Sequence, residues 1–263
     1  MKSIIRFILF LLFLSCADEF VPENPIDPGN PDYIPPIVSI TGGLESGQTI
    51  TQENLTVNFS GNETSMLFRT RLDSMNWSGW ANALNATLEY LDEGDHQFSL
   101  QGKYTTGDTS DIVSLPFTVD AVQGPSLMHH PRRQYASQGE TIQFTIIAEE
   151  VFDLAGLELV IEYDPAKVEL MGVTQSSLFD DMGQGPIFFN EVAETQGRLT
   201  ITLAVWGEDA PSFTGTDSIA IIDLRINQSG NITIDFGNDP IFRDPNNLDI
   251  QIAETVPGLI VVN

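Results

Sequence analysis

The sequence is poor in cysteine, histidine and basic residues. Its 263 residues include one Cys, three His and 11 Lys or Arg against 37 Asp or Glu, which gives a formal net charge of −26. A surface of this charge repels phosphates, so we expect no nucleic-acid partner and no polybasic membrane patch. One cysteine excludes an internal disulfide framework. Hydrophobic residues make up 41%, enough for real cores.

Motifs of common catalytic and metal sites are also missing. We find no HExxH, CxxC or glycine-rich phosphate loop and no Gly-x-Ser-x-Gly elbow, so we predict no catalytic residue, no metal site and no cofactor. Residues 244–249 place oxygen ligands at short spacing and leave calcium open, although an Asn/Asp turn is the alternative. A Ser/His/Asp triad assembles from distant positions, so a small hydrolase on a β scaffold stays a third hypothesis.

The only long apolar stretch lies at the N-terminus, over residues 4–14, behind Lys2 and Arg6. It is shorter than the ~20 residues that cross a bilayer. Its positive start and apolar core are typical of a signal peptide. A buried strand or helix is the alternative interpretation.

Residues 12–16 read LFLSC and resemble a bacterial lipobox, in which a small residue precedes a cysteine that is lipidated. The resemblance implies a lipoprotein signal peptide over residues 1–15 and a membrane anchor at Cys16. One acyl chain holds weakly, at ~0.8 kcal/mol per buried CH₂. Several chains on Cys16, palmitate among them, would give stable anchoring.

Ala17, Asp18 and Glu19 resemble the acidic export signal of Bacteroidetes-type surface lipoproteins; an ordinary acidic tail is the alternative. The resemblance implies a lipid-anchored protein of the cell outer membrane, exposed at the surface, although the sequence leaves the periplasmic face open. Prolines then recur up to Pro36 and favour polyproline II, at ~3.1 Å per residue. We therefore predict a lipidated, proline-rich tether over residues 16–36.

Beyond Pro36 the chain shows short alternating runs broken by Gly, Asn and Asp, the pattern of antiparallel sandwiches. Residues 37–119 hold about seven candidate strands, including residues 77–80 and 96–104. This number and spacing predict an immunoglobulin-like (Ig-like) sandwich. The motifs in residues 67–73, 77–80 and 91–98 resemble Ig-like modules of bacterial surface proteins and periplasmic sensors.

Residues 124–263 carry nine or ten further candidate strands, which suit a jelly roll. Over residues 157–163, Leu157, Leu159, Ile161 and Tyr163 face one way and the intervening residues face the other. Pro165 then ends this strand, because proline cannot donate a ladder hydrogen bond.

Several segments of this second part resemble a cohesin module: GET at 139–141, DLAGL at 153–157, YDPAKVEL at 163–170, GRLTI at 197–201 and GLIVV at 258–262. The resemblance implies a nine-stranded jelly-roll sandwich related to carbohydrate-binding modules. Cohesins include receptors for dockerin modules, with one sheet face carrying the partner. We find no dockerin-like repeat, cellulase module or wall anchor in this chain, so the identity of the partner stays open.

If the partner lies on the outward side of the sheet, the binding face includes Glu158, Val160, Glu162, Thr200, Thr202, Thr233 and Asp235. A solvated face that keeps the sheet soluble is the alternative. Trp77, Trp80 and Trp206 could instead stack on sugar rings, although packing of Trp77 in the core and of Trp80 at an edge is the structural alternative.

The sequence thus predicts an all-β protein: an N-terminal Ig-like β-sandwich followed by a nine-stranded, cohesin-like jelly roll. We expect a non-catalytic lipoprotein of the cell envelope whose cohesin-like domain binds a protein or a glycan. The alternative is a surface glycan-binding lipoprotein of a polysaccharide-utilisation system.

Overall fold

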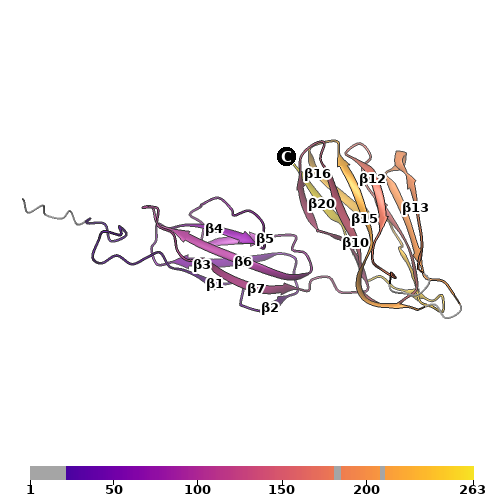
Figure 1. The fold of residues 1–263 in the computed structure, drawn as a ribbon, viewed down its shortest axis with the longest axis horizontal. Helices are drawn as coiled ribbons and strands as arrows, with labels where there is room; N and C mark the ends of the chain where they lie inside the picture. Colours follow the sequence, from indigo (N-terminus) through magenta and orange to yellow (C-terminus); the bar gives the residue numbers. More distant parts are fainter. Residues whose placement is uncertain (1–21, 181–184, 208–210) are drawn as a thin grey trace, which may run out of the picture.

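The structure is a computed structural model that describes residues 22–180, 185–207 and 211–263. Within these residues the regular secondary structure is almost entirely β-strand, arranged in four sheets that form two sandwiches in succession (Figure 1). The expected all-β sandwich fold is confirmed. The predicted signal peptide, Cys16 and the export signal 17–19 lie outside the described residues. None of the described helical segments has the length and hydrophobicity needed to cross a membrane.

The first module packs a three-stranded sheet, in the order β1-β3-β5, against a four-stranded sheet, in the order β2-β7-β6-β4. Val57 and Phe59 of one sheet and Phe98 and Leu100 of the other are buried in the core between them. The strands are β1 (Val38–Gly42), β2 (Gln48–Ile50), β3 (Leu55–Gly61), β4 (Leu67–Leu72), β5 (Asn85–Leu88), β6 (Gly94–Lys103) and β7 (Val113–Val119).

The strand predicted over residues 77–80 is wrong. This segment instead runs along the free edge of β4, where the Ala81 and Phe68 backbones exchange two hydrogen bonds of 2.8 and 2.9 Å. The Ser78 N–H donates to the Thr70 carbonyl at 2.9 Å. The segment therefore covers an edge strand that would otherwise expose unpaired backbone groups.

The described part of the tether, residues 22–36, is not extended as expected. It forms turns closed by three successive backbone hydrogen bonds of the i+3 to i type. The ring of Tyr33 packs edge-on against that of Tyr104, with centroids 6.5 Å apart, and the Tyr104 hydroxyl donates to the Ile34 carbonyl at 2.9 Å. Contacts with the first module thus override the polyproline II preference.

The second module packs a five-stranded sheet, in the order β12-β15-β10-β8-β19, against a larger sheet. The larger sheet has the order β13-β14-β11-β16-β20-β9, with β17 and β18 beside β11. The elements are β8 (Ser126–His130), β9 (Arg133–Ala136), β10 (Thr141–Leu154), β11 (Gly156–Glu162), β12 (Val168–Gln175), β13 (Ile187–Ala193), the 3-10 turn η1 (Glu194–Gln196), β14 (Arg198–Ala204), β15 (Phe213–Ile226), β16 (Gly230–Phe236), β17 (Ile241–Arg243), β18 (Asp249–Ile250), β19 (Glu254–Val256) and β20 (Gly258–Val262).

The predicted alternation along β11 is confirmed, since Leu157, Leu159 and Ile161 are all buried. Each meets the inward side chains of the five-stranded sheet, such as Phe144 and Ile222, in one continuous core. Full burial of a Leu, Ile or Phe side chain contributes about 1.5–3 kcal/mol. This core fixes which side of β11 faces outward.

His129, on β8, lies inside the second module and not in a linker between modules. Its ring centroid is 4.3 Å from that of Phe236, and Nδ1 is 3.3 Å from the Val256 carbonyl oxygen. Nε2 is buried without a partner among the described residues. Burial in this apolar setting lowers the pKa of His129 to about 4. The ring is therefore neutral in the folded protein at neutral pH.

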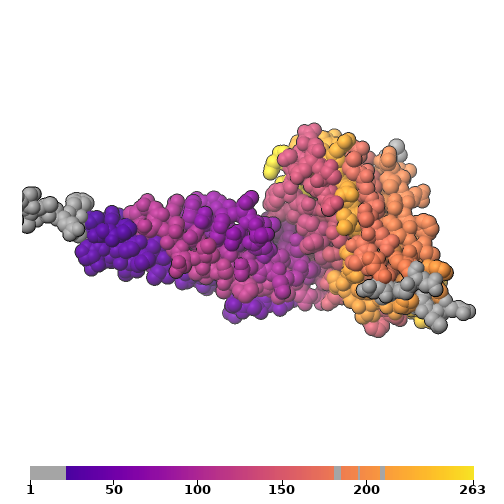
Figure 2. Space-filling view, viewed as in Figure 1, coloured from indigo at the N-terminus to yellow at the C-terminus, as the bar shows by residue number. Residues whose placement is uncertain are grey.

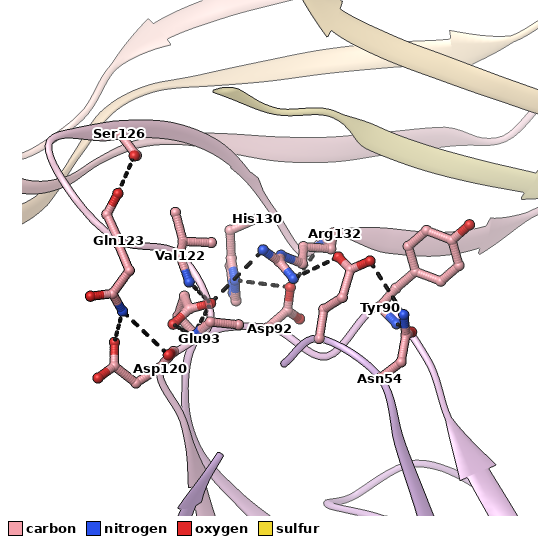
Figure 3. A network of polar contacts seen from close by, with 12 residues as sticks. Asn54, Tyr90, Asp92, Glu93, Asp120, Val122, Gln123, Ser126, His130 and Arg132 are labelled. Atoms are coloured by element: carbon pink, nitrogen blue, oxygen red, sulfur yellow. Dashed lines mark hydrogen bonds and ion pairs between the residues drawn. The ribbon is translucent and has the colours of Figure 1, made fainter. Parts of the chain in front are cut away.

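The two modules follow one another along the long axis (Figure 2). Polar side chains meet where the modules join. Arg132, directly before β9, is 3% exposed and points into this junction (Figure 3). Its Nη1 lies 2.9 Å from Glu53 Oε2 and its Nη2 lies 3.9 Å from Glu93 Oε1, while its backbone N–H donates to Asp92 Oδ1 at 2.6 Å. One buried arginine thus joins three carboxylates of the first module to the second, two through its guanidinium and one through its backbone N–H.

Glu93 also holds the segment that connects the modules. Its carboxylate accepts the backbone N–H groups of Ala121 and Val122 at 2.9 and 3.1 Å. Burial raises the pKa of Glu93, and these N–H groups and Arg132 oppose that rise. His130 lies 3.6 Å from Asp92 on the same junction, and this carboxylate raises the pKa of His130.

We expect Arg132→Met to destabilise the protein by roughly 2–3 kcal/mol. This is below the ~3–5 kcal/mol cost of breaking a fully buried pair, because Glu53 is half-exposed and Glu93 keeps its backbone donors. The matched control is Arg225→Met, which removes an exposed pair with Glu169 and should cost at most ~1 kcal/mol. Urea unfolding followed by circular dichroism measures both; equal losses would contradict the role of the junction.

We expect His129 to make folding sensitive to acid. Below the ordinary His pKa of ~6.5 the unfolded chain binds a proton that folded His129 does not, so stability falls by up to ~1.4 kcal/mol per pH unit. The loss continues down to the folded pKa of about 4. In His129→Leu this contribution disappears, so the stability difference between variant and wild type should change with pH in this window. A difference that stays constant from pH 7 to pH 4 would rule the assignment out.

Candidate functional site

The outward side of the larger sheet in the second module is a continuous face. Antiparallel pairing sets Glu158 opposite Thr202, Val160 opposite Thr200, and Glu162 opposite Arg198 on β14. Directly opposed residues lie on the same side of a sheet. Because Leu157, Leu159 and Ile161 point into the core, these pairs point outward.

All seven residues predicted for the binding face lie on this side of the sheet. Glu162 is opposed by Asp235 of β16, and Thr233 is opposed by Leu259 of β20. Glu158, Glu162, Thr233 and Asp235 are exposed, whereas Val160, Thr200 and Thr202 are half-buried. The register therefore brings together residues from three strands, and their role in binding stays a prediction.

One end of the face is apolar. The row Phe189, Thr202, Glu158, Ile241 crosses β13, β14, β11 and β17 in register. Phe189 is 66% exposed and Ile241 is 41% exposed. Two large apolar side chains thus flank a threonine and a carboxylate, and Thr202 Oγ1 lies 3.4 Å from Glu158 Oε2.

A groove runs beside this row. It has a volume of about 470 Å³ and is lined by Gly156, Ala204, Trp206, Ile241 and Arg243, among others. Trp206 follows the end of β14 and is 54% exposed. The lining combines the small residues Gly156 and Ala204 with the large apolar residues Trp206 and Ile241, which suits an apolar side chain of a partner.

The other end of the face is polar. Arg198 Nε lies 3.6 Å from Glu162 Oε1, and Asp235 lies opposite Glu162. Between the ends, Gly237 sits against Val160: a Cβ on Gly237 would be 2.9 Å from the Val160 Cβ, so a larger residue there would displace the valine. The face therefore combines an apolar groove with a rim of carboxylates and hydroxyls.

The sequence missed Phe189, Ile187 and Ile241 as members of this face. Residues 187–193 read IFFNEVA, which lacks a clean period of two, and β17 has only three residues. The one available signal was the apolar pair at 188 and 189, which cannot reveal which of them points outward. The structure shows that Phe188 packs against the core and Phe189 does not.

The three tryptophans do not share a site. Trp206 lines the groove of the second module. Trp77 and Trp80 lie in the first module, where cationic side chains stack on both rings. Trp206 is thus the tryptophan of the set that lies beside the predicted binding face.

The calcium candidate at residues 244–249 is a turn closed by its own aspartate. Asp244 Oδ1 accepts the backbone N–H groups of Asn246 and Leu248, both at 2.8 Å. Asp249 pairs with Arg243 at 2.6 Å. No cluster of three or more His, Cys, Asp or Glu suited to a metal occurs in the described part of the chain. The geometry favours the Asn/Asp turn.

His96 has both ring nitrogens occupied. Nδ1 lies 2.8 Å from Asp73 Oδ2 and Nε2 lies 2.8 Å from the Asp92 carbonyl oxygen. Burial opposes the charged form, but these hydrogen bonds outweigh it and raise the pKa of His96. A general base needs a free ring nitrogen facing the proton it takes. The arrangement suits a structural imidazolium that ties the 73–75 turn to β6.

Comparisons with known proteins agree on the second module. The family model described as "Cohesin domain" matches residues 132–262. No curated protein matches the sequence.

Solved cohesins align with about half of this chain at low identity. The matched chain of a type I cohesin–dockerin complex from Clostridium thermocellum is 16% identical to this chain, with a TM-score of 0.45. The alignment covers 52% of this chain and 92% of that chain. The sixth cohesin of Acetivibrio cellulolyticus scaffoldin B, solved with a dockerin, is 14% identical, with a TM-score of 0.47. The alignment covers 54% of this chain and 100% of that chain. A non-cellulosomal cohesin from the archaeon Archaeoglobus fulgidus is 17% identical, with a TM-score of 0.43, over 52% and 90%.

Residues 132–262 therefore match the cohesin domain, which is a non-catalytic protein-binding module.

Proposed function

We propose that this chain displays its cohesin domain at the cell envelope to capture a protein partner on the outward face of the larger sheet. The observation that carries the proposal is the apolar groove between Trp206 and Ile241, set directly beside the hydroxyl and carboxylate row of Thr202 and Glu158. Stable interfaces combine a desolvated apolar anchor with a polar rim in this way.

The charges on the face define the partner further. Glu158, Glu162, Glu191 and Asp235 are exposed on it, and Arg198 and Arg243 supply cations there, each paired with a carboxylate. Complementary charge raises association rates and suppresses wrong partners. We expect a partner that offers one large apolar side chain flanked by Lys, Arg or hydroxyl donors. A dockerin is the first module to test, because the solved cohesins from C. thermocellum and A. cellulolyticus are complexes with dockerins.

The envelope location in this proposal rests on the N-terminal sequence. A lipid on Cys16, followed by Ala17, Asp18 and Glu19, would place the described modules outside the membrane, at the outer-membrane surface. The Ig-like module then acts as a spacer, and the Arg132 junction holds the cohesin domain in a set orientation on it.

A glycan is the second candidate ligand. It is favoured by Trp206, whose exposed ring lines the groove and could stack on a sugar. An exposed aromatic ring in an apolar groove can contact either a protein side chain or a sugar ring, so binding is tested with polysaccharides as well as with proteins.

We expect Ile241→Asp to weaken partner binding by at least ~10-fold, or ~1.4 kcal/mol, because a carboxylate in the groove removes an apolar contact and adds repulsion beside Glu158. The matched control is Met171→Asp, which changes an apolar residue of comparable exposure (50% against 41%) on the opposite sheet. The immobilised full chain is first used to retain surface proteins. Titration calorimetry then measures the affinity of each variant for a retained protein and for dockerins.

Equal affinity of both variants for the retained protein would contradict the assignment of the face. If no protein is retained, and affinity electrophoresis shows that polysaccharides retard wild type but not Trp206→Ala, the glycan candidate replaces the protein partner.

We expect Cys16→Ser to abolish acylation and to move the protein from the membrane to the soluble fraction, since the thiol is the attachment atom for the lipid. Labelled palmitate incorporation and membrane fractionation measure this, with Ser15→Ala as a control that keeps a small residue before the cysteine. Unchanged incorporation in Cys16→Ser would refute the anchor.

A further inference from the structure

Three cations and two tryptophans interleave on the outward side of the four-stranded sheet in the first module. Arg71 lies 4.7 Å from the Trp77 ring centroid, and Arg69 lies 4.7 Å from the same ring. Arg69 is also 4.6 Å from the Trp80 ring, and Lys103 Nζ is 4.6 Å from Trp80. We call this row Arg71, Trp77, Arg69, Trp80, Lys103 the cation ladder.

The cation ladder is held in place from below. Arg69 of β4 lies directly opposite Gln101 of β6. Gln101 Oε1 accepts hydrogen bonds from Nε and Nη2 of Arg69 at 3.0 and 2.6 Å. Gln101 in turn donates to the Ser110 carbonyl at 3.0 Å. Because the 78–81 segment is hydrogen-bonded to the edge of β4, both tryptophans are fixed as well. The positions of the cations are thus preorganised.

The charges of the cation ladder have no carboxylate partner within the part of the chain that the structure describes. Ion pairs among the described residues include Arg132, Arg133, Arg198, Arg225 and Arg243, and none includes a cation of the ladder. Three of the 11 basic residues therefore stay unpaired side by side in a chain with 37 acidic ones.

The side chains of the cation ladder are half-buried. Nε of Arg71 is also buried without a hydrogen-bond partner among the described residues. Partial desolvation strengthens the attraction between such a cation and an incoming anion. The ladder is therefore a concentrated positive site on an acidic protein.

We propose that the cation ladder docks a short, extended acidic segment of a partner polypeptide. Arg69 and Arg71 are two residues apart on one strand, which separates them by about 6.6–6.8 Å. Alternate carboxylates on one side of an extended peptide recur at the same spacing. Each guanidinium can then meet one carboxylate through its remaining donors.

Two observations favour a short peptide over other anions. A long polyanion would run past the ladder onto the surrounding surface of a chain whose net charge is −26, where it is repelled. Stacking of a sugar is disfavoured because cations already lie over both tryptophan rings. Since the edge of β4 is covered by residues 78–81, the peptide contacts side chains and does not add a strand.

This docking surface lies in the first module and is independent of the cohesin face. The test uses the full chain carrying Trp206→Phe, so that Trp77 and Trp80 are the fluorescent reporters. The probes are a peptide of four Glu-Thr repeats and its Gln-Thr counterpart. We expect saturable quenching by the acidic peptide only, with affinity falling between ~50 and ~200 mM salt.

The double variant Arg69→Gln, Arg71→Gln should weaken binding at least ~10-fold, as expected for loss of charge-assisted contacts. Lys103→Met keeps an unbranched apolar side chain against Trp80, so it serves as a variant that retains the fold; it should weaken binding about 3-fold. The matched control, Lys167→Gln, neutralises a cation in the second module and should leave the affinity unchanged.

The proposal is overturned if both peptides bind equally well. It is also overturned if Lys103→Met and the double variant keep the wild-type affinity for the acidic peptide, or if Lys167→Gln lowers this affinity as much as they do. So would retention of polygalacturonate together with no binding of the acidic peptide, which would assign the ladder to anionic glycans. Partner binding at the cohesin face is measured separately with Ile241→Asp, so failure of one proposal leaves the other standing.

Discussion

The register of β11 is the constraint on which the rest of the second module depends. Leu157, Leu159 and Ile161 must point into the core, and this choice places Glu158, Val160 and their cross-strand neighbours outside. A slip by one residue would exchange the two sets and bury two carboxylates without partners. The core therefore positions the binding face, even though none of the residues of the face contributes to the core.

Much of this arrangement could be predicted from local pattern. The alternation in β11 and β14 is long enough to fix a face, and the order of short motifs indicates the cohesin domain. The pattern failed where an element is short or where contacts decide the conformation. β17 has three residues, too few for a period, and the 77–80 segment is held by stacking on Arg69 and by the edge of β4, which no local propensity encodes.

Electrostatics divide the molecule into regions with different tasks. Five arginines form ion pairs among the described residues, and the pairs of the buried Arg132 join the modules. The cohesin face is acidic around its groove, whereas the cation ladder is a local positive site. Two sites of opposite local charge on one acidic chain allow two different partners to be held without competition, one by apolar insertion with a polar rim and one by charge.

The most direct measurement of the central claim is the hydrogen-exchange footprint of a captured partner on the full chain. The account predicts slower exchange in β13, β14 and β17 at the apolar end of the face, with no change in β12 and β15 of the opposite sheet. Protection confined to the opposite sheet, or to the first module alone, would contradict it.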